Sequence, residues 1–361
     1  MLERADVRGG ARASETAAGG NRAWAARTAW REQAGRPDLL RWLAWAAVVS
    51  VVGLIGTGAW VRLSGSGLGC PTWPDCTKAS VVAPASYHAL VEFVNRCIIT
   101  TVGIVVALSL AASLLRRPLR RDLCLLSGGL VAGYVGEAVL GGITVLLKLA
   151  PALVAAHLVL AMLLLGDAVV LHWRAGSCER SSQVVADRGV TLLADLLLLA
   201  TLFVVAAGTV VAGTGPHSGS PGTPRFNFDL RSTAEFHAIA GMFLFGLVVA
   251  VCSLLYVLRV PRAAWRRYWL VAGLLVLQGT LGYSTWFSHI EVDVTEAHVF
   301  VAGVLVVALV RFRLGFSSPR VQAPQSSGRP SSSGCAATCN TKSPANSTKT
   351  TPTPTPSSMI V

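Results

Sequence analysis

Long apolar stretches recur along this chain, separated by short polar connections. Each is long enough to cross about 30 Å of hydrocarbon as a helix, which satisfies its own backbone hydrogen bonds in lipid. Apolar and polar residues do not alternate within the stretches, which disfavours a transmembrane β-barrel. We therefore predict an all-α membrane protein with eight transmembrane helices, near residues 41–63, 88–115, 123–147, 151–173, 190–213, 233–258, 268–288 and 294–312.

Arginine and lysine gather on every second connection. The N-terminal segment, three connections and the residues just after the last stretch hold 22 of them, and the opposite side holds 5. Positive residues stay on the cytoplasmic side. We therefore predict a multi-pass protein of the cell (plasma) membrane with both termini cytoplasmic. The net charge of +13 is then mostly a topology signal, not a sign of nucleic-acid binding. With 14% charged residues, against about 25% in soluble proteins, the chain is not an ordinary soluble enzyme.

Composition divides the chain into five segments. Residues 1–40 are basic and residues 314–361 are rich in Ser, Thr and Pro. Neither can bury a core, so both are predicted to be disordered cytoplasmic tails. Between them we predict an N-terminal four-helix bundle at 41–174, a cytoplasmic linker at 175–189 and a C-terminal four-helix bundle at 190–313.

The two predicted bundles resemble each other weakly in sequence. Residues 137–157 align without gaps onto 278–298 at an offset of 141, with five of 21 positions identical. His157 and His298 are one of the identical pairs. An even number of helices in each unit gives both units the same orientation, so the halves are predicted to be parallel, pseudo-symmetric repeats.

Polar residues form a layer near the outer side of the predicted membrane. His157, His237 and His298 each lie five or six residues from the outer end of a predicted helix, roughly 8 Å deep at 1.5 Å per residue. Glu92 and Asn95 lie at a similar depth in the second helix. Ionisable groups inside a membrane are costly and are functional candidates by default.

Two imidazoles from facing helices at one depth can bind a haem iron from both sides. The alternatives for His237 and His298 are hydrogen-bonded core histidines or a proton relay, although a relay usually runs across the membrane. The first unit differs, because Asn95, a poor iron ligand, stands near the position that corresponds to His237. His157 alone leaves one face of a bound haem free for chemistry.

Glu92 and Arg96 are spaced i,i+4 and share a helix face. They form either a neutralising ion pair or a site in which Glu92 is an acid, base or charge stabiliser. Glu137, inside the third helix, is a second candidate of this kind. Arg62 is a candidate partner for a propionate at the outer surface.

Eight cysteines occur, and only Cys70 and Cys76 lie together in an outer loop. The outer side is oxidising, so the sequence favours a short disulfide. Zinc binding is the alternative, although no other good ligands are nearby. Whether such a disulfide is structural or redox-active stays open.

Several segments, taken in order, resemble the haem A synthase family. They are RLSGSGLGCPTWPDC at 62–76, EFVNR at 92–96, GTGPHS at 213–218, EFH at 235–237 and TEAH at 295–298. The resemblance covers residues 41 to 313. It implies two four-helix bundles, with His237 and His298 as the axial ligands of a haem b cofactor. The N-terminal bundle then binds the substrate, haem O.

The resemblance also implies the activity: oxidation of the C8 methyl group of haem O to a formyl group by successive hydroxylations, giving haem A for terminal oxidases. It makes Glu92 catalytic and places Asn95, Arg96 and His157 at the substrate haem, with His157 a candidate ligand of its iron. Cys70 and Cys76 match the family's outer-loop disulfide. Asn95 departs from the family pattern Glu-x-x-His-Arg.

Two other functions are weighed against this one. The alternative is a membrane b-type cytochrome that carries electrons without modifying haem, for which both bundles need full ligation. A transporter with parallel repeats is disfavoured, because its polar site belongs near the midplane. The expected partners are haem O, membrane lipid, the haem O synthase that supplies the substrate and an electron acceptor of the respiratory chain. A homo-oligomer stays open.

Overall fold

Eight long helices make up most of the computed structural model, which describes residues 37–176, 182–184 and 188–319. Each of the eight is long and apolar enough to cross a membrane, so the predicted all-α, multi-pass fold is confirmed. Of the tails predicted to be disordered at 1–40 and 314–361, residues 1–36 and 320–361 lie outside the described residues, whereas 37–40 belong to the first helix. The helices are α2 (Pro37–Leu63), α3 (Tyr87–Leu115), α4 (Arg121–Leu146), α5 (Pro151–Ala175), α6 (Arg188–Thr214), α7 (Leu230–Val257), α8 (Arg262–Phe287) and α9 (Val292–Leu314).

A short antiparallel ribbon accompanies the helices. Strand β1 (Ser182–Val184) pairs with β2 (Ser317–Pro319), with Gln183 opposite Ser318. β1 lies in the segment predicted as a linker, and β2 in the segment predicted as a disordered tail. The ribbon therefore ties the connection between the two halves to the residues just after α9.

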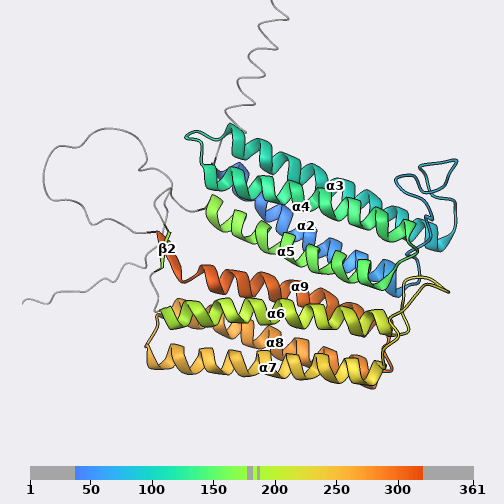
Figure 1. Cartoon of the computed structure of the whole chain (residues 1–361). Coiled ribbons are helices and arrows are strands. Elements are labelled where there is room, and N and C mark those ends of the chain that lie inside the picture. Colours follow the sequence, from blue (N-terminus) through green and yellow to red (C-terminus); the bar gives the residue numbers. More distant parts are fainter. Residues whose placement is uncertain (1–36, 177–181, 185–187, 320–361) are drawn as a thin grey trace, which may run out of the picture. The chain divides into compact units, whose positions relative to one another are not determined.

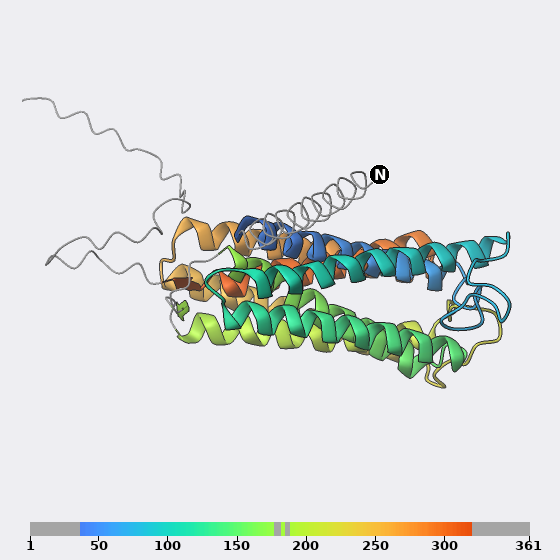
Figure 2. The ribbon, with the colours of Figure 1, turned by 90° about the horizontal axis from the view of Figure 1, so that it is seen from above.

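The helices form two four-helix bundles that lie side by side (Figure 1), and in the view from above the first bundle lies in front of the second (Figure 2). The first bundle consists of α2 to α5 and the second of α6 to α9, with consecutive helices in contact in each. In the second bundle, α7 and α8 touch only slightly. The bundles meet where α9 packs on α2 and α5, and where α5 packs on α6. Within each bundle, helices that are two apart in sequence, such as α7 and α9, face each other across the bundle.

The two ends of the bundles differ in their connections. One end, here named the loop end, carries the long connections 64–86 and 215–229 and the short turns 147–150 and 288–291. The other end, here named the arginine end, carries the connections 116–120 and 258–261 with their arginines.

Packed apolar cores occupy the half of each bundle next to the arginine end. In the second bundle the core residues lie at 190–197, 244–255, 264–275 and 305–316. The first bundle repeats this arrangement, with its core concentrated at 40–55, 102–112, 123–130 and 162–175. Towards the loop end, glycines and Leu63 apart, the buried helix side chains in the described regions are small or polar: Ala89, Glu92, Thr144, Thr201, Ala207, Thr209 and Ala240.

The turns between paired helices confirm the internal repeat. Lys148 and Leu149, between α4 and α5, have φ values of 53° and 59°. His289 and Ile290, 141 positions later, have φ values of 59° and 65°. Such values are uncommon outside glycine. The N–H of Leu149 donates to Thr144 and that of Ile290 to Thr285, each over 2.8 Å, so both halves close their last helix pair with the same turn.

Backbone and side-chain bonds join the two halves at the loop end. Arg62, the last arginine of α2, donates through Nε to the carbonyl of His217 over 2.9 Å and through Nη2 to the carbonyl of Ala212. The N–H of Gly67 donates to Gly219 over 2.8 Å. His217 Nε2 in turn lies 2.9 Å from the carbonyl of Ile290. That Arg62 binds a propionate stays a prediction. In this structure its guanidinium donates hydrogen bonds to two carbonyl groups of the second half.

Asp229 fixes the start of α7, the helix that carries His237. Its carboxylate accepts from the backbone N–H of Ser232 over 2.7 Å and from the hydroxyl of the same residue over 2.8 Å. The backbone bond, with support from the hydroxyl, lowers the pKa of Asp229 below its usual value. This is the ordinary chemistry of a helix N-cap.

Replacing Leu130 with alanine tests the position of the first core. Leu130 is fully buried, whereas Leu125 on the same helix is 77% exposed and faces the surface. We expect Leu130→Ala to lower the free energy of unfolding by about 2–5 kcal/mol, because the change leaves a cavity. Leu125→Ala is the control and should change it little. Denaturant unfolding in detergent measures both, and equal effects would contradict the assignment.

Candidate functional site

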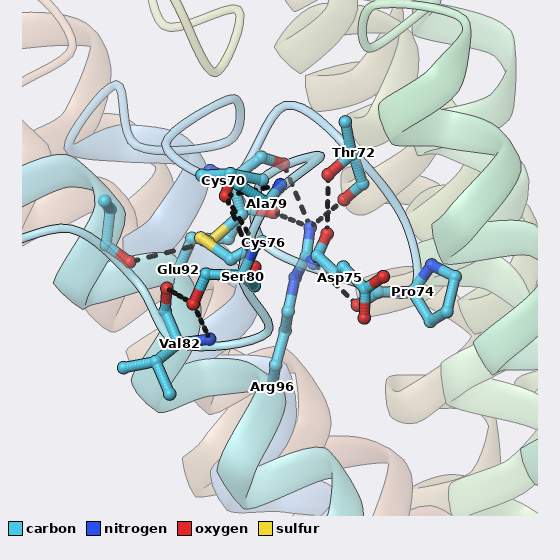
Figure 3. The surroundings of a disulfide bond; sticks show 12 residues. Cys70, Thr72, Pro74, Asp75, Cys76, Ala79, Ser80, Val82, Glu92 and Arg96 are labelled. Carbon is cyan, nitrogen blue, oxygen red and sulfur yellow. Dashed lines mark hydrogen bonds and ion pairs between the residues drawn. A yellow bond between two sulfur atoms is a disulfide. The ribbon is translucent and has the colours of Figure 1, made fainter.

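Glu92 and Arg96 of α3 lie beneath the disulfide loop of residues 70–76 (Figure 3). Arg96 Nη2 is 2.6 Å from Glu92 Oε1, and Glu92 Oε2 accepts the backbone N–H of Cys70 over 2.7 Å. Glu92 is only 4% exposed. The predicted ion pair is therefore present, and it holds a buried carboxylate in one orientation next to the loop.

Arg96 also holds the loop itself. Its Nη1 donates to the carbonyls of Pro74 and Asp75 over 3.2 Å each, and its Nη2 to those of Cys70 and Thr72 over 3.0 Å each. A guanidinium can do this because it presents several N–H donors in a rigid fork. The loop is thus folded around the side chain of Arg96.

Cys70 and Cys76 form the predicted disulfide, which closes the loop on itself. Both cysteines are buried. Their sulfur atoms are consumed by this bond, so the alternative of a zinc site is wrong for this structure. Cys97, Cys124 and Cys252 are free thiols.

His157 of α5 pairs with Glu137 of α4. Its Nδ1 lies 2.6 Å from Glu137 Oε2, and its Cε1 lies 3.3 Å from the point where a Cβ on Gly141 would stand. The two atoms are within ion-pair distance, although they do not have the geometry of a hydrogen bond. A carboxylate beside Nδ1 leaves Nε2 available to a metal, as around many histidine ligands. Glu137 therefore acts on the ring of His157, which gives this second candidate carboxylate a definite partner.

Asn95, the residue that replaces a histidine of the family pattern, is engaged with α2. Its Oδ1 accepts the hydroxyl hydrogen of Thr57 over 2.8 Å. The side-chain oxygen is therefore turned towards a neighbouring helix of the same bundle. An amide in this position gives the first bundle no second imidazole.

His237 of α7 and His298 of α9 meet inside the second bundle. Their ring centroids are 6.2 Å apart and the ring planes are inclined by 78°. Both side chains lie beyond the packed core, on the loop-end side of the bundle. Their buried Nδ1 atoms make no hydrogen bond of good geometry within the described residues, although the backbone of Val204 lies close to His237 and that of Gln278 close to His298.

Each of these rings packs against a glycine. A Cβ on Gly208 would lie 2.9 Å from Cε1 of His237, and a Cβ on Gly282 would lie 3.0 Å from Cε1 of His298. Gly282 is the repeat counterpart of Gly141. Gln278, the counterpart of Glu137, places its amide nitrogen 3.2 Å from Nε2 of His298. We name Gly141, Gly208 and Gly282, the glycines against which the histidine rings pack, the seat glycines. The repeat therefore preserves the seat glycine of the histidine and changes the polar residue beside the histidine.

Two further carboxyl groups, inside α5 and α9, were not predicted from the sequence to be functional. Asp167 Oδ2 and Glu296 Oε2 are buried and have no hydrogen-bond partner among residues 37–176 and 188–319. Asp167 faces Gly129, and Glu296 faces Gly56 of α2. Their position inside apolar stretches is the signal that identifies such residues in a sequence.

The three seat glycines were also missed as functional positions, although Gly141 and Gly282 stand out as identical in the repeat. A glycine in a helix does not reveal which side chain crosses it. That contact depends on the packing of a second helix.

Comparison with known proteins places the chain in a family. A sequence profile of the COX15-CtaA family, described as cytochrome oxidase assembly protein, matches residues 41–310. The chain belongs to this family. It is 26% identical to a heme A synthase of Shewanella oneidensis over 326 residues, covering 75% of this chain and 94% of the relative. It is 27% identical to a heme A synthase of a Methylobacterium species over 350 residues, covering 78% of this chain and 94% of the relative.

The match to the COX15-CtaA family spans all eight helices almost completely. It includes the disulfide loop, Glu92 with Arg96, His157 with Glu137, and the pair His237 and His298. Every polar group of the two sites described above therefore lies within the family region.

Replacing Arg96 with lysine tests its hold on the loop. Lysine keeps the charge but lacks the fork of donors, so several charge-assisted hydrogen bonds are lost, each worth about 1.5–3 kcal/mol. We expect amide hydrogen exchange in residues 70–76 to rise about tenfold or more.

The control is Arg231→Lys, which alters an exposed i,i+4 ion pair with Glu235 on α7. It should leave exchange in the loop unchanged. Unchanged exchange in Arg96→Lys as well would show that the disulfide alone orders the loop.

Proposed function

We propose that this protein is a haem A synthase, an oxidoreductase that converts the C8 methyl group of haem O into a formyl group. The observation that carries the proposal is the facing pair His237 and His298 in the second bundle, set against a single imidazole, His157, in the first. Membership of the COX15-CtaA family and the names of two relatives support the same activity. Haem A made in this way is destined for terminal oxidases.

The second bundle fits a haem b held by His237 and His298. Metal–imidazole bonds are about 2 Å long, so rings with centroids 6.2 Å apart leave room for one iron between them. The two ligands come from helices that face each other across the bundle. The glycine seats let both rings approach the bundle axis, and the packed core ends before this level is reached. Bound there, a haem b supplies one-electron transfer.

The first bundle fits a substrate haem with one free face. Glu137 lies 2.6 Å from Nδ1 of His157, so Nε2 is the proposed ligand for the iron of haem O. Asn95 adds no second imidazole, so the other side of the iron stays open. An incompletely ligated haem suits chemistry on the molecule, whereas two axial histidines suit electron transfer.

Glu92 is proposed as the catalytic residue, with Arg96 positioning it. Conversion of a methyl group to a formyl group passes through an alcohol and then a diol that loses water; each hydroxylation adds the oxygen of a water molecule and releases two protons and two electrons, which the electron acceptor takes up. Glu92 is a buried carboxylate at the loop end of the substrate bundle, held by Arg96 and Cys70. It is placed to accept protons or to stabilise positive charge that develops at the reacting carbon.

The orientation in the membrane is proposed from charge. The arginine end carries most of the basic residues and is assigned to the cytoplasm, which puts both termini inside. The loop end and its disulfide then face the oxidising side. Haem O synthase is proposed to hand over the insoluble substrate, and an electron acceptor of the respiratory chain to remove the electrons.

Expression together with a source of haem O, followed by mass analysis of extracted haems, tests the activity. Haem A is expected to accumulate. Haem O that persists beside a normal b-type spectrum would favour the alternative of a b-type cytochrome without haem chemistry.

Glu92→Gln separates catalysis from cofactor binding. We expect it to retain haem b in the second bundle and to lower conversion at least about 100-fold, the usual minimum contribution of an acid–base group. Glu235→Gln is the matched control, since Glu235 also forms an i,i+4 ion pair but is exposed. Wild-type conversion by Glu92→Gln would remove Glu92 from the mechanism.

Alanine at the glycine seats tests the cofactor site without touching a ligand. Gly208→Ala and Gly282→Ala place a methyl group about 3 Å from an imidazole carbon and should cost about 1–3 kcal/mol. We expect roughly tenfold weaker retention of haem b, measured as haem per protein after purification. Gly279→Ala, on α8 with nothing within 4 Å, is the control. Full haem content in both seat variants would argue against this site.

A further inference from the structure

Trp73, in the middle of the disulfide loop, lies against α4. A Cβ on Gly142 would stand 2.6 Å from Cδ2 of the indole. The carbonyls on either side of Trp73, those of Thr72 and Pro74, accept hydrogen bonds from Arg96 over 3.0 and 3.2 Å. Arg96 of α3 therefore holds the backbone of the loop on both sides of Trp73, and the indole of Trp73 lies on α4.

The indole rests one residue away from the seat of His157. Gly141 faces the imidazole of His157, and Gly142 faces the indole of Trp73. Both contacts occur at the loop end of the first bundle, beyond its packed core. The two side chains therefore meet α4 at consecutive residues, at the same end of the first bundle.

The second bundle has no counterpart of this contact. Gly282 keeps the seat of its histidine at the repeat offset, but Tyr283 occupies the position that corresponds to Gly142. The connection 215–229 contains no tryptophan. An indole on the helix of the histidine-facing glycine therefore belongs to the first bundle, whereas the connection of the second bundle packs Phe226 on Gly213 of α6 instead.

We propose that Trp73 is a positioning residue for haem O, seated on Gly142 and covering the loop end of the substrate site. The inference rests on the proposed function. Trp73 is 44% exposed, so part of its indole surface remains free to pack against a porphyrin. A flat aromatic ring gives a large apolar contact at a defined angle. The same ring shields the oxidised carbon from water at this end of the bundle.

Titration of the purified, haem b-containing enzyme with ferric haem O, without an electron acceptor, tests the proposal. Trp73→Ala removes the indole, and Gly142→Ala keeps the indole but displaces it. Both are expected to weaken haem O binding about tenfold in this titration and, in separate turnover assays with an electron acceptor, to raise KM for haem O more than they lower kcat. Trp73→Phe should restore most of the affinity. Gly128→Ala, on the same helix with nothing within 4 Å, should bind as the wild type does.

The Soret band of haem b in the second bundle reports whether each variant is folded. Wild-type affinity for haem O in both Trp73→Ala and Gly142→Ala overturns the proposal. A second result also overturns it: Trp73→Ala binds haem O weakly, Trp73→Phe binds it no better than Trp73→Ala does, and Gly142→Ala binds it as the wild type does. A wild-type enzyme that never converts haem O overturns the proposed function instead, so the two failures are distinguishable.

Discussion

The contact on which both sites depend is the close approach of an imidazole ring to a helix at a glycine, which has no Cβ. Gly141, Gly208 and Gly282 each let a histidine ring lie directly on a helix backbone. Any larger residue moves the ring off the bundle axis. Because lipid offers no water to satisfy a displaced imidazole, the ring must find its partner within the protein. Three glycines thereby set where three histidines point, in the half of each bundle next to the loop end.

The duplicated halves show how one scaffold serves two purposes. Turn geometry, glycine seat and histidine recur at an offset of 141, while the polar residue beside the histidine changes from Glu137 to Gln278. A carboxylate can only accept a hydrogen bond from an imidazole, whereas an amide can also donate one. The facing helix also differs, with His237 in one half and Asn95 near the corresponding place in the other. These two exchanges make one half suited to a fully ligated haem and the other to a haem with an open side.

Hydropathy, charge and the repeat were enough to predict the eight helices, the polar layer and the pairing of Glu92 with Arg96. These features are local, or follow from the length of a helix and the thickness of a membrane. The hydrogen bonds from Arg96 to four carbonyl groups of the loop were not predictable, because every residue has a backbone carbonyl and the sequence does not show which ones a side chain will reach. The contacts of Trp73 with Gly142 and of Glu137 with His157 depend on how neighbouring helices rotate about their axes. The bonds of Arg62 to Ala212, near the end of α6, and to His217, in the connection that follows, were not predictable either, because they join residues at least 150 positions apart.

The bonds of Arg62 make the two halves depend on each other. The last arginine of the first half donates to carbonyls of the second, and Gly67 donates to Gly219. A first half on its own would expose a guanidinium without these acceptors, and a second half on its own would leave the carbonyls to water. The two bundles are therefore repeats in sequence but a single bonded unit at the loop end.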